Sequence, residues 1–342
     1  MSEKIKELFD SYVNEHNFSG VALIKRGDNT TFEFTSGYAH KGYQISNHIH
    51  TRFDTASITE LFTASGIVLL ESEGKLRFTD KIHDLVDLSN TEIPTDVEIR
   101  HLLTHTSGIA DDADEESGED YSALFVDSPN YAFCENKDFL KNFAYKKSNF
   151  KAGTAVRYNN CAFVLLGLVI EKISGKGYRE FITERIFKPF GMQSTLFHAM
   201  DHIGENIAEG YYFNQTEQIW KKNIYSYPPI GTGDSGAYTT VYDLDRFIRT
   251  LRKSPIYEKM LTPQTEQKRL QGDVIIKYGY GFEFIERNGV ITSLYKEGCN
   301  AGVCNITSYY PTLDTTFTIL GNQDCNVWKL HDLVQELLLK QK

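Results

Sequence analysis

Residues 53–76, FDTASITELFTASGIVLLESEGKL, place a serine at the start of a predicted buried helix and a glutamate three residues later. On a helix this spacing puts Ser57 and Glu60 one turn apart on the same face. A serine hydroxyl becomes a nucleophile when a nearby base accepts its proton, and a carboxylate can act as such a base. Serine is also a common N-terminal helix cap, so this segment alone fits either a reactive serine or a structural one.

The elements that must position this helix come from both ends of the chain. Residues 20–39 predict two strands around a turn at 27–29, and residues 278–298 predict a hairpin that turns at Asn288–Gly289. Residues 303–311 and 315–323 predict two more strands. A helix is expected at each terminus, because apolar residues recur there at helical spacing. These residues are Ile5, Leu8, Phe9 and Tyr12 near the start, and Leu330, Leu333, Val334, Leu337 and Leu338 within 327–340.

The middle of the chain is predicted to be mostly helical, with helices at residues 57–74, 160–174, 177–187 and 242–252. The expected fold class is therefore α+β: an antiparallel sheet built from both chain ends, flanked by the terminal helices, with a helical insertion. We predict a sheet subdomain of residues 1–55 and 275–342 and a mostly helical subdomain of residues 56–274, forming one structural unit.

Charge and hydropathy exclude several classes of partner. The 36 basic and 46 acidic residues give a net charge of -10, which argues against nucleic acid and anionic membranes as main partners. No apolar run approaches the roughly 18 residues that a membrane-spanning helix needs. The amphipathic start has no signal-peptide core, so we expect a cytoplasmic protein, or a secreted one if a leader was removed.

The five cysteines are odd in number and widely spaced, which predicts free buried thiols rather than a disulfide framework. No CxxC pair suggests zinc. His101 and His105 stand four residues apart but lack a third ligand, so we interpret them as structural. Neither a metal nor a cofactor is expected.

Four further segments follow the Ser57 helix in order along the chain. They are IRHLLTHTSGI (99–109), VRYNNCAFVLLGLVIEKISGKGYREFITERIFKPFGM (156–192), SGAYTTVYDLDRFI (235–248) and KEGCNAG (296–302). Together they resemble the serine β-lactamase-like family, which includes class C β-lactamases, D,D-peptidases and related esterases and D-aminopeptidases. The resemblance covers nearly the whole chain. It implies a β-lactamase-like fold with the active site between the sheet and the helical region.

The family pattern is Ser-x-x-Lys, then Tyr-x-Asn, then Lys/His-x-Gly. The resemblance implies that Ser57 is the nucleophile and that Tyr158 is the phenol that shuttles its proton. It also implies that Asn160 holds the carbonyl side of a substrate. A plainer interpretation remains for this motif, because tyrosine and asparagine are also ordinary residues at a helix start.

The third motif is Lys296-Glu297-Gly298. Lys296 matches the family's cation, although a surface lysine on an edge strand is the plainer alternative. Glu297 stands where the family has a hydroxyl residue that binds the substrate carboxylate, and Gly298 completes the motif. The resemblance implies an oxyanion hole formed by the backbone N–H groups of Ser57 and Cys299.

Glu60 departs from the family pattern, which has lysine at this position. A neighbouring cation lowers a tyrosine pKa, whereas an anion raises it, so Glu60 is expected to make Tyr158 a poorer base. Three interpretations are open. Glu60 is itself the base, or it only pairs with Lys296, or it marks a disabled site, natural or engineered. Sequence reasoning favours the disabled site slightly over the rewired one.

The charged residues expected near Ser57 indicate which substrates would bind. Glu60 and Glu297 near one lysine predict poor binding of carboxylate-bearing penicillins, and favour neutral esters and amides or amine-bearing D-amino acid derivatives. The acidic segment DDADEESGED (111–120) is interpreted as a solvated loop, with a negative rim at the cleft mouth as the alternative. The functional hypothesis is a serine hydrolase that forms an acyl-serine intermediate on a small ester, amide or peptide-like substrate. The alternative is a non-catalytic binding protein or an inactive engineered variant with the same fold.

Overall fold

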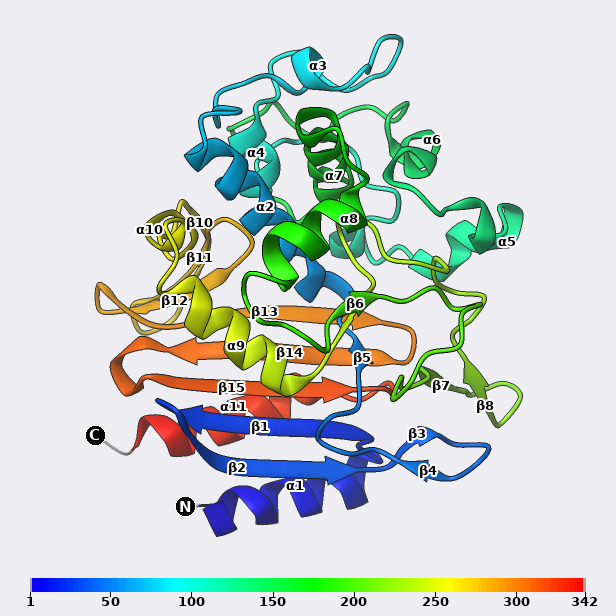
Figure 1. Cartoon of the computed structure of the whole chain (residues 1–342), viewed down its shortest axis with the longest axis vertical. Helices are drawn as coiled ribbons and strands as arrows, with labels where there is room; N and C mark the ends of the chain where they lie inside the picture. Colours follow the sequence, from blue (N-terminus) through cyan, green and yellow to red (C-terminus); the bar gives the residue numbers. More distant parts are fainter. Residues whose placement is uncertain (1, 341–342) are drawn as a thin grey trace.

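An antiparallel eight-stranded sheet runs through the molecule in the order β10-β11-β12-β13-β14-β15-β1-β2 (Figure 1). The computed structural model describes residues 2–340. The strands are β1 (Gly20–Arg26), β2 (Asn29–Ser36), β10 (Thr265–Leu270), β11 (Val274–Tyr278), β12 (Glu283–Arg287), β13 (Val290–Asn300), β14 (Val303–Tyr310) and β15 (Thr315–Gly321). The two chain ends meet where β1 pairs with β15, as the sequence predicted.

One face of the sheet is covered by the terminal helices α1 (Ser2–His16) and α11 (Val327–Leu339). Ile5, Phe9 and Tyr12 of α1 are buried there, as their spacing predicted. Leu330, Val334 and Leu338 of α11 are buried in the same cluster, but Leu333 is exposed. The prediction that Leu333 shares the apolar face is wrong, because that position points away from the sheet.

The other face of the sheet packs against α9 (Val241–Leu251) and the helical layer built around α2 (Glu60–Ser72) and α7 (Asn160–Ser174). Both α2 and α7 are buried along most of their length, as expected for helices at the centre of a layer. Smaller helices surround them: α3 (Ile82–Leu85), α4 (Ile99–Leu103), α5 (Leu124–Asp127), α6 (Leu140–Phe143), α8 (Tyr178–Ile182) and α10 (Tyr257–Met260).

Seven short strands form three small sheets, in the orders β3-β4, β5-β9-β6 and β7-β8. They are β3 (Tyr38–His40), β4 (Ile45–Ser46), β5 (Phe53–Asp54), β6 (Leu196–Phe197), β7 (Tyr211–Asn214), β8 (Ile219–Lys222) and β9 (Ala237–Thr239). Within residues 2–340, no helix combines the length and the apolar character that crossing a membrane requires.

The α+β class predicted from the sequence is confirmed, and several predicted elements occur where their patterns placed them. The hairpin turn at Asn288–Gly289 has φ values of 50° and 76°, the left-handed conformations that favour these two residues in a tight turn. The helix predicted at 177–187 is α8 followed by a π-helical turn at Thr183–Phe187. β10 and the first residue of β11 fall inside residues 56–274, the range that the sequence assigned to the helical subdomain.

β13 carries the contact between the sheet and the helical layer. β12 pairs with β13 only as far as Tyr295, so the following residues pair with β14 alone. This free edge lies against the 3₁₀ turn Ala56–Thr59 at the start of α2. A Cβ atom at Gly298 would lie 2.1 Å from the carbonyl oxygen of Thr55 and 3.2 Å from the backbone nitrogen of Ser57. Glycine at 298 is therefore what allows β13 to approach Ser57.

We expect Gly298→Ala to lower the free energy of unfolding by about 1–3 kcal/mol, because the new methyl group would push β13 away from the turn. Urea unfolding measures this directly. Gly177→Ala is the matched control, since no atom lies within 4 Å of its added Cβ and its φ is -60°, and we expect it to cost less than about 1 kcal/mol. Equal stability of the two variants would contradict the close approach of β13.

Candidate active site

Ser57 lies inside the 3₁₀ turn that leads into α2, and not at a helix cap. The preceding residue, Ala56, has a left-handed φ of 44°, an uncommon conformation for a residue with a side chain. Asp54 supports this conformation, because its Oδ1 accepts a hydrogen bond of 2.8 Å from the Ala56 N–H. Asn305 of β14 in turn donates to the Asp54 carbonyl at 2.8 Å. The sheet therefore fixes the backbone that presents Ser57.

Two cavities meet at Ser57. The first has a volume of about 490 Å³ and is lined by Ser57, Glu115, Glu116, Tyr158, Gln267, Tyr278, Glu283, Lys296, Glu297, Gly298, Cys299 and Trp328. The second has a volume of about 250 Å³ and is lined by Ala56, Ser57, Glu115, Asp120, Tyr121, Ser122, Asn160, Asp234, Ser235, Cys299, Asn300 and Ala301. Every site residue predicted from the sequence except Glu60 lines at least one of them.

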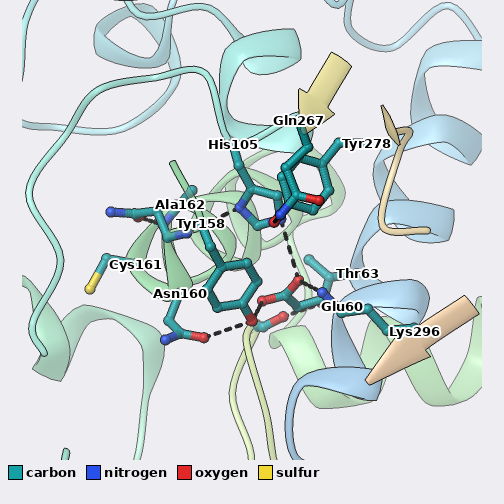
Figure 2. A network of polar contacts seen from close by, with 12 residues as sticks. Glu60, Thr63, His105, Tyr158, Asn160, Cys161, Ala162, Gln267, Tyr278 and Lys296 are labelled. Carbon is teal, nitrogen blue, oxygen red and sulfur yellow. Dashed lines mark hydrogen bonds and ion pairs between the residues drawn. The ribbon is translucent and has the colours of Figure 1, made fainter. Parts of the chain in front are cut away.

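Glu60 lies behind the cavity wall with its carboxylate fully buried. Figure 2 shows the carboxylate between two partners from distant parts of the chain. The Lys296 ammonium donates to Oε2 at 2.6 Å, and the Tyr158 hydroxyl donates to Oε1 at 2.7 Å. The Lys296 ammonium also lies 4.9 Å from the centre of the Tyr158 ring. The three side chains thus form one compact cluster beside Ser57.

Burial sets the ionisation of this cluster. It raises the pKa of Glu60 to about 7, although the charge of Lys296 and the hydrogen bonds from Lys296 and Tyr158 oppose the rise. Burial and the charge of Glu60 raise the pKa of Tyr158 well above its usual value, while a hydrogen bond with Ser57 lowers it. Near neutral pH Tyr158 is therefore a neutral phenol, and Glu60 is the group that can exchange a proton.

His105 lies next to the cluster, although the sequence had suggested only a structural role. Its Nε2 lies 3.8 Å from Oε2 of Glu60, and its ring packs 4.7 Å from the Tyr158 ring. Burial and the charge of Lys296 lower the pKa of His105 well below its ordinary value, so the ring is neutral. The Asn159 N–H donates to Nδ1 at 3.2 Å, which leaves the proton on Nε2, facing Glu60.

Asn160 is held by acidic residues. Its Oδ1 lies 3.0 Å from the Tyr158 hydroxyl, whose single proton is donated to Glu60 in the shorter contact, and its Nδ2 donates to Oε1 of Glu115 at 3.0 Å. Its backbone N–H donates to the buried carboxylate of Asp111 at 2.9 Å. Asn160 thus borders the second cavity with its side-chain nitrogen and its backbone N–H both bonded to carboxylates.

The acidic segment 111–120 forms part of the cavity walls. Glu115 and Glu116 line the first cavity, and Glu115 and Asp120 line the second. The interpretation as a solvated loop is therefore incomplete, and the alternative of a negative rim describes the position of these side chains. Asp111 and Asp112 are buried with Cys161, close enough for the three to share an ion, but the Asp111 carboxylate already accepts the N–H groups that begin α7.

The third motif divides between the two faces of β13. Side chains alternate along a strand, so Lys296 and Glu297 leave β13 in opposite directions. Both still line the first cavity, because β13 is an edge strand at this point. Burial and then the charge of Glu283 raise the pKa of Glu297 to about 8. Within the part of the chain that the structure describes, Lys296 is the only basic residue among those lining the two cavities.

Sequence reasoning did not identify Gln267, Tyr278, Glu283 and Asp234 as residues of the cavity walls. Gln267 lies on the unpredicted strand β10, where it donates to the Tyr278 hydroxyl at 2.7 Å. None of these residues belongs to a recognisable motif. The signal that could have directed attention to His105 was its position in the LLTHTSG segment, which the family resemblance had already selected.

Comparisons with known proteins show which family and fold the chain resembles. The model of the family described as Beta-lactamase matches residues 5–334. Penicillin-binding protein 4* of Bacillus subtilis (strain 168) is 29% identical over 293 residues, which cover 81% of this chain and 62% of that protein. The chain therefore spans less than two thirds of the length of this curated relative.

Solved structures extend the similarity to three dimensions. The crystal structure of a penicillin binding protein from Bacillus halodurans superposes with a TM-score of 0.90 at 33% identity, covering 97% of this chain and 99% of that chain. The octameric penicillin-binding protein homologue from Pyrococcus abyssi superposes with a TM-score of 0.84 at 23% identity, covering 99% of this chain and 78% of that one. The second likeness concerns the fold alone.

Proposed function

The chain belongs to the beta-lactamase family, and we propose that it is a serine hydrolase in which Glu60 takes the place of a catalytic lysine. The reaction is acyl transfer to Ser57 from a small ester or amide, followed by hydrolysis of the acyl-serine intermediate. The observation that carries the proposal is the hydrogen bond of 2.7 Å from the Tyr158 hydroxyl to Glu60, beside the serine.

The proposed proton path runs through Tyr158. As Ser57 Oγ attacks the substrate carbonyl, its proton passes to the phenol oxygen of Tyr158, and the phenolic proton passes to Oε1 of Glu60. Tyr158 never carries a full negative charge, which suits its raised pKa. A base with a pKa of about 7 has the proton affinity that general base catalysis at neutral pH requires. The reverse path returns the proton to the leaving group.

Two further groups complete the proposed site. The backbone N–H groups of Ser57 and Cys299 would stabilise the oxyanion of the tetrahedral intermediate, since Gly298 brings β13 against the Ser57 backbone. Lys296 keeps Glu60 oriented and balances its charge when it is ionised. The positive charge of Lys296 thus pairs with Glu60 inside the protein.

The second candidate is a site that binds but does not turn over. It is favoured by the same ion pair of 2.6 Å, because a carboxylate neutralised by a buried ammonium is a weaker proton acceptor. In that case Glu60 stabilises the fold and no efficient base is left for Ser57. The two candidates differ in what happens when the carboxylate is removed.

We expect Glu60→Gln and Tyr158→Phe each to slow hydrolysis of p-nitrophenyl acetate by about 10²–10⁴-fold, since both remove the path for the Ser57 proton. Tyr158→Phe is the cleaner variant, because it leaves the pair of Glu60 and Lys296 in place. Glu60→Lys should also reduce activity. Glu283→Gln is the matched control, a carboxylate of the same cavity that contacts Tyr295 instead, and it should keep most activity.

Retained activity in Glu60→Gln, or a gain in Glu60→Lys, would contradict the role of Glu60 as the base. It would instead support a site that is impaired because glutamate stands in the place of the lysine. Loss of a partner can destabilise a buried ion pair by about 3–5 kcal/mol, so unfolding curves must accompany the rates. Labelling of Ser57 by a fluorophosphonate, absent in Ser57→Ala, identifies the nucleophile independently of the choice of substrate.

The charge of the cavities supports a choice among substrates. Glu115, Asp120 and Asp234 line the second cavity without a basic residue among its described lining side chains. The one lysine of the first cavity is paired with Glu60. We therefore propose that neutral acyl groups, or acyl groups that carry an amine, are accepted, and that carboxylate-bearing substrates are disfavoured.

Matched p-nitrophenyl esters test this choice, with acyl chains of equal length that end in an ammonium, a methyl or a carboxylate group. We expect kcat/KM for the carboxylate ester to be lower by at least about tenfold, because like charges placed together cost several kcal/mol. Benzylpenicillin should react more slowly than the neutral ester. Added salt should reduce the differences in kcat/KM among the three esters, because it screens the charges. Preference for the carboxylate ester would contradict the proposed specificity.

A further inference from the structure

Cys299 and Cys304 face each other across the hairpin of β13 and β14. The two residues are paired directly in the strand register. The next pair along the hairpin, Asn300 and Val303, closes the two-residue turn. The closing pair of such a turn is hydrogen-bonded, so the next pair is a non-hydrogen-bonded one, with Cα atoms about 4.5 Å apart. A disulfide needs a Cα separation of about 4.4–6.8 Å. The backbone is therefore already placed for a bond between the two sulfur atoms.

The surroundings of Cys304 favour its thiolate. Hydrogen bonds from the thiols of Cys299 and Cys325, together with the backbone N–H groups of Val327 and Cys325 at the start of α11, lower the pKa of Cys304 far below the usual value of a thiol. The same contacts keep the protons on Cys299 and Cys325 and raise their pKa values. Among the three sulfur atoms, the thiolate is thus favoured at Cys304.

The cluster opens to solvent through Cys299. Free, buried thiols were expected from the sequence, and all five cysteines are free, but Cys299 is exposed while Cys304 is 2% exposed. Cys299 also lines both cavities beside Ser57. A small oxidant that enters the cavities therefore meets Cys299 first and finds Cys304 directly behind it.

We propose that Cys299 and Cys304 form a dithiol site that hydroperoxides oxidise to a disulfide, and that this bond slows reaction at Ser57. The link to Ser57 rests on the proposed function, whereas formation of the disulfide does not. Cys299 lies in the wall of the substrate cavity with Cys304 behind it, and the reagent that modifies the two cysteines covalently is hydrogen peroxide or a small organic hydroperoxide.

The chemistry balances with the peroxide as oxidant. The Cys304 thiolate attacks a peroxide oxygen and the O–O bond breaks, which yields a sulfenic acid on Cys304 and releases hydroxide. The hydroxide removes the proton from Cys299 to form water. The Cys299 thiolate then attacks the Cys304 sulfur, the disulfide forms, and a second hydroxide leaves and is protonated by solvent. The thiolate and the thiol lose two electrons in total, and one peroxide becomes two waters.

The bond acts on the site through the backbone of β13. Cys299 follows Gly298, which lies against Ser57, and its N–H is the proposed second donor to the oxyanion. A disulfide ties this residue to β14 and so fixes the strand edge that contacts the serine. Exposed disulfides are also the ones that thiols reduce readily, and Cys299 is exposed, which makes the modification reversible.

The test treats the full chain, first reduced, with hydrogen peroxide and then blocks the remaining thiols under denaturing conditions. Cleavage after Lys296 and Tyr309 places Cys299 and Cys304 in one fragment and Cys325 in another. We expect the first fragment to lose two hydrogens and to carry no blocking group, while Cys325 is blocked. We expect acylation of Ser57 to slow by about 10²-fold, the typical cost of one oxyanion donor, and to recover with dithiothreitol.

Cys304→Ser should abolish both effects, and Cys134→Ser, a cysteine outside the cluster, should behave as the parent. If the serine variant does not fold, Cys304→Ala replaces it, and the fragment masses of the parent decide the pairing alone. Two blocked thiols in the first fragment, or a bond between Cys304 and Cys325, would overturn the site. If the disulfide forms but the rate of Ser57 acylation is unchanged, the proposed effect on Ser57 is wrong. A reduced protein that hydrolyses no ester would refute the proposed function and leave the fragment masses to test the dithiol.

Discussion

A fully buried carboxylate needs partners, because removing its charge from water costs several kcal/mol unless donors replace the lost solvent. Glu60 obtains them from two places in the chain, with Lys296 from the edge of β13 and Tyr158 from the segment before α7. This requirement ties the start of α2 to both the sheet and the helical layer. The close approach of Gly298 and the support of Ala56 by Asp54 belong to the same junction, since both position the backbone of Ser57.

Much of this junction could be predicted from the sequence, because its motifs are local. Ser57, Tyr158 and Lys296 each belong to a short motif that a family resemblance detects, and the structure brings the three together around one cavity. The strands at both chain ends were predictable for a similar reason, since they are short runs rich in apolar and β-branched residues, bounded by turn residues. The Asn288–Gly289 turn was predictable because its left-handed conformations favour these residues.

The remaining features depend on tertiary packing that no local pattern records. β10 is a polar edge strand with the sequence TEQKRL, so the apolar residues that would indicate a strand are almost absent. His105 and Glu115 reach the site only because the segment 101–116 folds back over α7, where Asn160 and Asn159 meet it. The pairing of Cys299 with Cys304 follows from a hairpin register that cysteine spacing alone does not give. The sequence favoured a disabled site because it placed the anion of Glu60 beside Tyr158. The sequence did not indicate that each oxygen of this carboxylate has a donor, Tyr158 on Oε1 and Lys296 on Oε2.

Glu60 is proposed as the final acceptor of the Ser57 proton, and the pH dependence of Ser57 acylation tests this most directly. The rate of labelling by a neutral fluorophosphonate would be followed from about pH 5 to about pH 9 in the parent and in Glu60→Gln. Because the pKa of Glu60 is raised to about 7, the basic form is lost as the pH falls through that value. We therefore expect the labelling rate of the parent to rise through about pH 7, and the slower rate of Glu60→Gln to lack this rise. A rise of the same shape in both proteins, or a parent rate that is flat across neutral pH, would contradict it.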